Sequence, residues 1–130
     1  MLLVIDSHSG VPVYRQLMEQ IKFHIASGLL GPGDELPPTR ALSAQLGVNP
    51  MTISKAYSFL EKEDVVERRP GKPLIVRPLK EEQLKEEKID QLRKSLGPTV
   101  RIARQLGISG DEALETFRKM LDDQSSQEEE

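Results

Sequence analysis

The residues whose types and spacing could do chemistry gather in two short stretches and at one isolated arginine. The first stretch begins at Asn49 and combines amide, hydroxyl and ammonium groups with a methionine, and the second surrounds Gly71 with basic side chains. Such polar and cationic groups bind phosphate oxygens and base edges, and an apolar tip such as methionine can contact a thymine methyl. This chemistry is recognition of a nucleic acid, with no covalent bond made or broken. The candidate contact residues are Arg40, Asn49, Pro50, Met51, Thr52, Ser54, Lys55, Arg69, Gly71 and Lys72.

Two short helices are expected to position the first stretch. One helix is predicted from Pro38 to Leu46, with Gly47 ending it, and Asn49 and Pro50 are favourable as N-cap and first residue of the next helix. Apolar residues in that next helix recur at helical spacing, namely Ile53, Ala56, Tyr57 and Leu60. Two short helices joined by a glycine-containing turn predict a helix-turn-helix, whose second helix leads into the major groove with its N-terminal residues.

The elements on either side extend this prediction. A helix is expected from Pro12 to about Gly28, ahead of the two short helices. After them, β-prone residues at 65–67 and 74–76 flank a basic connection, which predicts a hairpin. The order helix, helix, helix, hairpin predicts a mainly α fold over residues 1–79, a winged helix-turn-helix. Gly71 would lie at the tip of the wing, where the backbone could approach a minor groove.

The rest of the chain is expected to be helical. A sparse apolar stripe begins at Leu84, and Gly97 and Pro98 predict a break in that helix. A shorter helix follows, and Ser109 with Glu112 predicts a capping box before an amphipathic helix. A core of this size is marginal alone, so we expect residues 80–122 to pack on the first domain or on a second copy of the chain as a homodimer. Residues 123–130 are polar and acidic, which predicts a disordered tail.

The net charge is −3 over 130 residues, which taken alone argues mildly against a nucleic-acid partner. The charge is unevenly distributed, however. Residues 1–79 carry 9 basic and 8 acidic side chains, and residues 80–130 carry 9 basic and 13 acidic ones. The negative charge therefore belongs to the C-terminal part of the chain, and the part that contains the expected wing is slightly basic.

Composition also limits the function classes. The length excludes a large catalytic barrel, which needs about 250 residues, and the absence of cysteine excludes disulfides and thiolate metal sites. His8 and His24 lack ligand spacing, so we expect no metal and no cofactor. No apolar stretch is long enough for a membrane helix and the N-terminus is not typical of a secretion signal, so the cytoplasm is the expected location and no membrane partner is expected.

Six stretches between residues 12 and 77 carry a resemblance to a known family: 12–17, 31–37, 40–42, 46–48, 49–57 and 67–72. In order and spacing they resemble the DNA-binding domain of the GntR family of bacterial transcription regulators. The Asn-Pro-x-Thr start at Asn49 and the short helical C-terminal segment resemble the YtrA subfamily. The resemblance implies a homodimer that binds an inverted repeat, often as a repressor, beside genes that often encode ABC transporters. It also implies DNA contacts by Arg40, by Thr52 and its neighbours, and by Gly71.

The chain departs from the family pattern at several positions. Pro38 stands where serine is usual, which alters the cap of the helix that carries Arg40. Asp64 replaces a common glycine before the hairpin, and Pro73 replaces a common glycine in the wing. Pro50 and Ser54 stand where other branches carry arginine, so base readout by arginine is not expected from these two positions.

The leading hypothesis is a transcription regulator that binds double-stranded DNA sequence-specifically as a homodimer. The alternative is a winged-helix module that binds a protein partner without specific DNA binding; the acidic total charge favours it, and fold alone does not decide function. An enzyme is not expected, because the chain has no room for a fused catalytic domain. The sequence leaves open the operator, any small-molecule effector and the sign of regulation.

Overall fold

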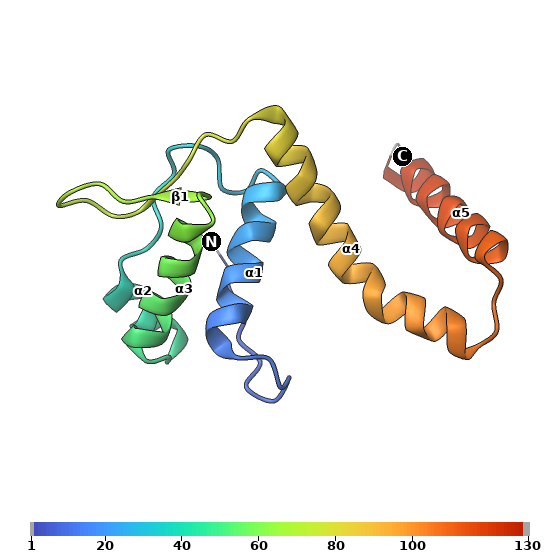
Figure 1. Cartoon of the computed structure of the whole chain (residues 1–130), viewed down its shortest axis with the longest axis horizontal. Helices are drawn as coiled ribbons and strands as arrows, with labels where there is room; N and C mark the ends of the chain where they lie inside the picture. The colour runs from blue at the N-terminus through green and yellow to red at the C-terminus, as the bar shows by residue number, and fades with distance from the viewer. Residues whose placement is uncertain (1, 129–130) are drawn as a thin grey trace. The chain divides into compact units, whose positions relative to one another are not determined.

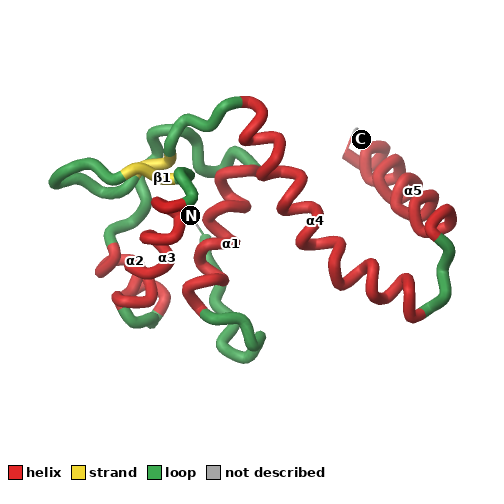
Figure 2. Tube along the Cα trace, in the orientation of Figure 1, coloured by secondary structure: helices red, strands yellow, loops and turns green. Residues whose placement is uncertain are grey.

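Three helices and a β-hairpin follow one another in the first part of the chain (Figures 1 and 2). The computed structural model describes residues 2–128, and the chain divides after Gln91 into two compact units. The first unit holds α1 (Val13–Ala26), α2 (Thr39–Leu46), α3 (Pro50–Lys62), β1 (Val66–Glu67) and β2 (Ile75–Val76). This order confirms the mainly helical winged helix-turn-helix expected from the sequence.

The core of the first unit is built around α3. The four apolar residues predicted at helical spacing on this helix are all buried: Ile53, Ala56, Tyr57 and Leu60. Leu17 and Ile21 of α1 and Leu42 of α2 belong to the same apolar cluster. Each of these large side chains contributes roughly 1.5–3 kcal/mol when fully buried, so the contacts that stabilise the fold also fix which face of α3 remains in solvent.

The turn between α2 and α3 has the local structure that its sequence predicts. Gly47 ends α2 in the left-handed conformation, with φ 66° and ψ 34°, which glycine adopts without steric cost. Asn49 is the N-cap of α3, and its side-chain oxygen accepts a hydrogen bond from the backbone N–H of Met51 at 2.8 Å. Pro50 is the first residue of the helix, where its missing N–H costs nothing.

The hairpin pairs in antiparallel register, Val66 with Val76 and Glu67 with Ile75. Asp64, which replaces a common glycine, has φ 60° just before β1. An extended segment at residues 33–36 joins the hairpin as a third strand-like edge, with a bridge between Glu35 and Ile75. The sequence does not signal this edge, because two or three residues of edge pairing produce no recognisable alternation.

The second half of the chain differs from the sequence prediction at Gly97 and Pro98. There α4 (Glu81–Gln105) runs without interruption, with Pro98 inside it, so the predicted break was wrong. Proline removes one backbone hydrogen bond and crowds the preceding turn, at a cost of about 3 kcal/mol. Gly97, Thr99 and Val100 beside it are poor helix formers, so the helix continues here against local propensity.

The last helix, α5 (Gly110–Glu128), begins after Ser109. The Ser109 hydroxyl accepts a hydrogen bond from the backbone N–H of Glu112 at 3.2 Å. It also donates a hydrogen bond to the Glu112 carboxylate at 3.1 Å. Ser109 therefore caps the helix, as its sequence predicts. The backbone of residues 123–128 is helical, where composition predicts a disordered tail, and residues 129 and 130 of that tail lie outside the described residues. No helix in the described range is long and apolar enough to cross a membrane.

Candidate nucleic-acid interface

The N-terminal end of α3 presents small polar groups and one apolar tip to solvent. Asn49 and Pro50 are both exposed, and Met51 is 78% exposed although its side chain is large and apolar. Thr52 is half-buried in the same turn. An exposed methionine at the leading end of a helix is suited to contact with a thymine methyl, and the free N–H groups of the first turn favour phosphate oxygens.

Farther along the outer face of α3, Ser54 and Lys55 are exposed. The Lys55 ammonium does not extend freely into solvent, because its nitrogen lies 4.1 Å from the centre of the Tyr14 ring. Tyr14 belongs to α1 and was not among the residues that the sequence suggested for the site. Its only signal in the sequence was its aromatic character, and a tyrosine on an apolar helix stripe usually belongs to the core.

Tyr57 connects α3 to the start of α2. Its hydroxyl donates a hydrogen bond to the backbone oxygen of Pro37 at 2.7 Å, and burial raises the pKa of the phenol above its usual value. Pro38 provides no side-chain cap for α2, so this bond from α3 helps to hold the chain that enters the helix, together with the hydrogen bond from Leu36 N–H to the Leu74 oxygen at 2.8 Å. Arg40 follows directly and is exposed at the first turn of α2.

The wing turns at Gly71, which has φ 68°. The backbone N–H of Lys72 donates to the Arg69 oxygen at 3.2 Å and closes the turn. Gly71 and Lys72 are exposed, whereas Arg69 is half-buried, and its Nε has no hydrogen-bond partner in the described part of the chain. Open space surrounds the position of a Cβ at Gly71, so a side chain there would be opposed by the positive φ and not by crowding.

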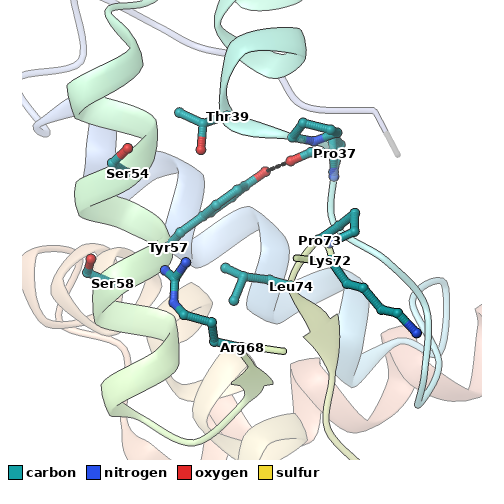
Figure 3. A pocket seen from close by; sticks show the side chains of 10 residues that line it. Pro37, Thr39, Ser54, Tyr57, Ser58, Arg68, Lys72, Pro73 and Leu74 are labelled. Carbon is teal, nitrogen blue, oxygen red and sulfur yellow. Dashed lines mark hydrogen bonds between the residues drawn. The ribbon is translucent and has the colours of Figure 1, made fainter. Parts of the chain in front are cut away.

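A pocket of about 240 Å³ separates α3 from the wing (Figure 3). It brings together Ser54 and Lys72 from the sequence-suggested set, but the Lys72 side chain extends away from Tyr57 in the close-up. Three further polar residues line it, namely Thr39, Ser58 and Arg68, and of these the sequence did not single out Thr39. Ser54 and Ser58 are four residues apart on the exposed face of α3, so their hydroxyl groups lie one above the other along the helix.

The charge of the pocket is moderated by an ion pair. Arg68 Nε lies 3.2 Å from the Glu61 carboxylate of α3, so this arginine also ties the wing to the helix. Lys72 is the other basic residue that lines the pocket. Hydroxyl groups and cations on the two walls of a groove form a surface that suits a phosphate backbone. Among the described residues, no cluster of His, Cys, Asp or Glu could hold a metal ion.

An exposed helix end in a helix-turn-helix, together with a basic wing across a groove, defines the class of winged helix-turn-helix DNA-binding proteins. Comparison with known proteins agrees with this class. Residues 13–76 match the family of "Bacterial regulatory proteins, gntR family", and the chain belongs to this family of transcription regulators.

Some relatives in the family are of similar length to this chain. The chain is 30% identical over 122 residues to the HTH-type transcriptional repressor YtrA of Bacillus subtilis (strain 168), with 94% of each chain covered. YtrA from Sulfolobus acidocaldarius, a GntR-family transcription factor of known structure, has 30% identity and a TM-score of 0.57, with 93% of this chain and 97% of that one covered. A GntR family transcriptional regulator from Listeria monocytogenes shares the fold, with a TM-score of 0.74 at 24% identity, covering 88% and 98% of the two chains.

Proposed function

We propose that this protein is a sequence-specific transcription regulator that reads double-stranded DNA with α2, α3 and the wing. The observation that carries the proposal is the exposed leading end of α3, where Met51 protrudes beside the capped first turn. In this proposal the turn from Asn49 to Thr52 enters the major groove and Ser54 and Lys55 flank it. Arg40 reaches a base edge or the backbone from α2. The wing, through Arg69, Gly71 and Lys72, approaches the adjacent minor groove.

The C-terminal helices are proposed to pair two copies of the chain. No residue of α4 is buried, and large apolar residues of α4, α5 and the loop between them are exposed, among them Ile89, Leu92, Ile102, Leu106, Leu114, Phe117, Met120 and Leu121. Exposed apolar stripes of this extent mark interaction surfaces. We therefore assign residues 1–79 to DNA binding and residues 80–122 to homodimerisation, as the sequence suggested.

A two-fold dimer would bind an inverted repeat, because each chain presents the same reading surface to one half-site. The name of the Bacillus subtilis relative describes a transcriptional repressor, and repression is the sign of regulation that we propose for this chain. The proposal that the protein regulates a transporter operon rests only on the resemblance to the YtrA subfamily. The proposed place of action is the cytoplasm, where the bacterial chromosome lies.

The contact assignment is tested with two substitutions, Arg40→Ala and Thr52→Ala, in gel-shift titrations against a duplex that the wild-type protein selects from a randomised pool. Each substitution should weaken binding about 10- to 100-fold, as expected when one base or phosphate contact is lost. Gln45→Ala is the matched control, because Gln45 is also exposed on α2 but lies at its C-terminal end. Wild-type affinity in both Arg40→Ala and Thr52→Ala would contradict the site assignment.

Salt dependence separates DNA binding from the alternative of a protein-interaction module. Neutralised phosphates release counterions, so the logarithm of the affinity should fall linearly with the logarithm of salt concentration. The slope gives the number of phosphate contacts. Binding that is independent of salt, or that is lost to any competitor duplex at low salt, would favour the protein-interaction module.

A further inference from the structure

Two aromatic rings form a stack between α1 and α3, and a lysine lies over each ring. Tyr14 of α1 and Phe59 of α3 have ring centres 5.5 Å apart and planes inclined by 21°. Lys55 Nζ lies 4.1 Å from the centre of Tyr14, and Lys62 Nζ lies 5.4 Å from the centre of Phe59. Both rings are half-buried and pack against the apolar core, so the stack is a fixed platform.

The platform restricts Lys55 more than Lys62, since its nitrogen lies closer to a ring. A lysine side chain in solvent has many rotamers, and ordering it on binding opposes association. A ring face within about 6 Å attracts an ammonium through its quadrupole. Tyr14 therefore keeps the Lys55 charge beside the second turn of α3, next to the surface proposed to meet DNA, before any DNA arrives.

We propose that Tyr14 is a positioning residue that holds the Lys55 ammonium for one phosphate of the DNA backbone. This inference rests on the proposed function and extends the interface to α1. A backbone phosphate is the partner, because lysine acts as a compact point charge and lacks the planar fork that reads guanine. A phosphate contact fixes register on the duplex and carries no sequence information of its own.

Lys62 provides an internal control for the same chemistry. It lies seven residues beyond Lys55 on α3, about 10 Å farther from the leading end at 1.5 Å per residue. It is exposed and lies over the other ring of the stack. Because of its place at the C-terminal end of α3, it is not expected to reach the duplex.

The test uses the full-length chain, with anisotropy titrations over a range of salt concentrations on two labelled duplexes. One duplex is selected by the wild-type protein from a randomised pool, and the other has the same composition in shuffled order. The variants are Lys55→Met, Tyr14→Leu, Tyr14→Phe, Lys62→Met and the double variant Tyr14→Leu/Lys55→Met. Thermal unfolding of each variant identifies any loss of binding that comes from unfolding.

Lys55→Met should weaken binding to both duplexes by the same factor and reduce the salt slope by about one unit per bound chain. Tyr14→Leu should weaken both about two- to fivefold, the value expected for an exposed cation–π contact. Tyr14→Phe should bind like the wild type because the ring face remains, and so should Lys62→Met. The double variant Tyr14→Leu/Lys55→Met should bind DNA as tightly as Lys55→Met alone, because Tyr14 acts on the affinity only through Lys55.

Three results would overturn the inference. Tyr14→Phe could lose as much affinity as Tyr14→Leu, which would assign the effect to the hydroxyl. The effects of Tyr14→Leu and Lys55→Met could be additive, or Lys55→Met could leave the salt slope unchanged. Each of these can occur in a protein that still selects its duplex, so this failure is distinct from failure of the proposed function, in which no duplex is preferred.

Discussion

Tyr57 contributes to the fold and to the site through different atoms. Its ring is buried in the core, and its hydroxyl donates to the Pro37 backbone oxygen at 2.7 Å, ahead of the helix that carries Arg40. Tyr57→Phe should lower the free energy of unfolding by about 1–2 kcal/mol, because one hydrogen bond is lost and the carbonyl remains partly buried. Urea unfolding at neutral pH measures this difference.

Comparison of the wild type with Tyr57→Phe also gives a prediction for how stability depends on pH. Burial raises the pKa of the Tyr57 phenol in the folded state, so above pH 10 the unfolded chain releases this proton while the folded chain retains it. The contribution of Tyr57 is then complete below pH 10 and is lost as the pH rises. The stability gap between wild type and Tyr57→Phe should narrow by about 1 kcal/mol between pH 9 and pH 11. A constant gap would show that Tyr57 ionises alike in both states.

At the scale of elements, an ion pair joins α1 to the end of α3. Lys22 Nζ lies 2.5 Å from the Glu63 carboxylate, and the side chains are 11% and 43% exposed. Burial alone would lower the pKa of Lys22, but the hydrogen bond and charge of Glu63, with the charges of Glu87 and Glu19, raise it overall. The ammonium is therefore kept charged in a largely desolvated place.

Removing one partner of this ion pair should cost more than removing both. Glu63→Gln leaves the Lys22 charge without its main partner and should destabilise the protein by about 1–2 kcal/mol. Lys22→Met in the Glu63→Gln background should recover part of that loss, because the methionine stem fills the same space without a charge. Chemical unfolding of the two single variants and the double variant measures the coupling. Additive losses would mean that the pair is a solvated surface contact.

Elements with a strong local signal could be predicted from the sequence. The turn at Gly47, the cap at Asn49 and the stripe on α3 follow from backbone preference and helical period, and the structure has them. Interactions that depend on tertiary contacts could not be predicted. Examples are the edge pairing of Glu35 with Ile75 and the ring of Tyr14 beneath Lys55, since each joins residues separated by about forty positions in the chain.

The N-terminal segment shows the same limit of sequence reasoning. Gln20 bonds both backbone groups of Val4, and Gln16 bonds both backbone groups of Asp6, at 2.6–2.9 Å. Glutamines four residues apart on α1 thus match alternate residues of an extended segment, because four residues of helix and two of strand both rise about 6–7 Å. The sequence shows the two glutamines, but nothing in it indicates that this segment would lie beside them.

At the scale of the whole molecule, the proposed dimer makes a prediction about α5. The double variant Leu114→Gln/Phe117→Gln replaces exposed apolar residues without changing the net charge, and glutamine retains helix propensity. It should sediment as a single chain at micromolar concentration, whereas the wild type should sediment as a dimer. Glu115→Gln/Lys119→Gln is the matched control on the polar face, also neutral in net charge, and should remain dimeric. A monomeric wild type would contradict the proposal that the C-terminal helices form a dimer.

The distribution of charge matters at this scale as well. The chain is acidic in sum, yet residues 1–79 carry 9 basic and 8 acidic side chains. Non-specific attraction to DNA, which depends on the number of phosphates neutralised, should be modest for such a surface. In the proposed dimer, specific binding then comes from two copies of the reading surface placed at a fixed spacing.

Sequence-selective binding is the central claim, and the most direct test is the affinity ratio between a selected duplex and its shuffled counterpart at physiological salt. We predict that selection from a randomised pool enriches an inverted repeat whose half-sites lie about one helical turn apart, and that this duplex binds at least about 1,000-fold more tightly. Selection that enriches no motif, together with equal affinities for the two duplexes, would contradict the claim.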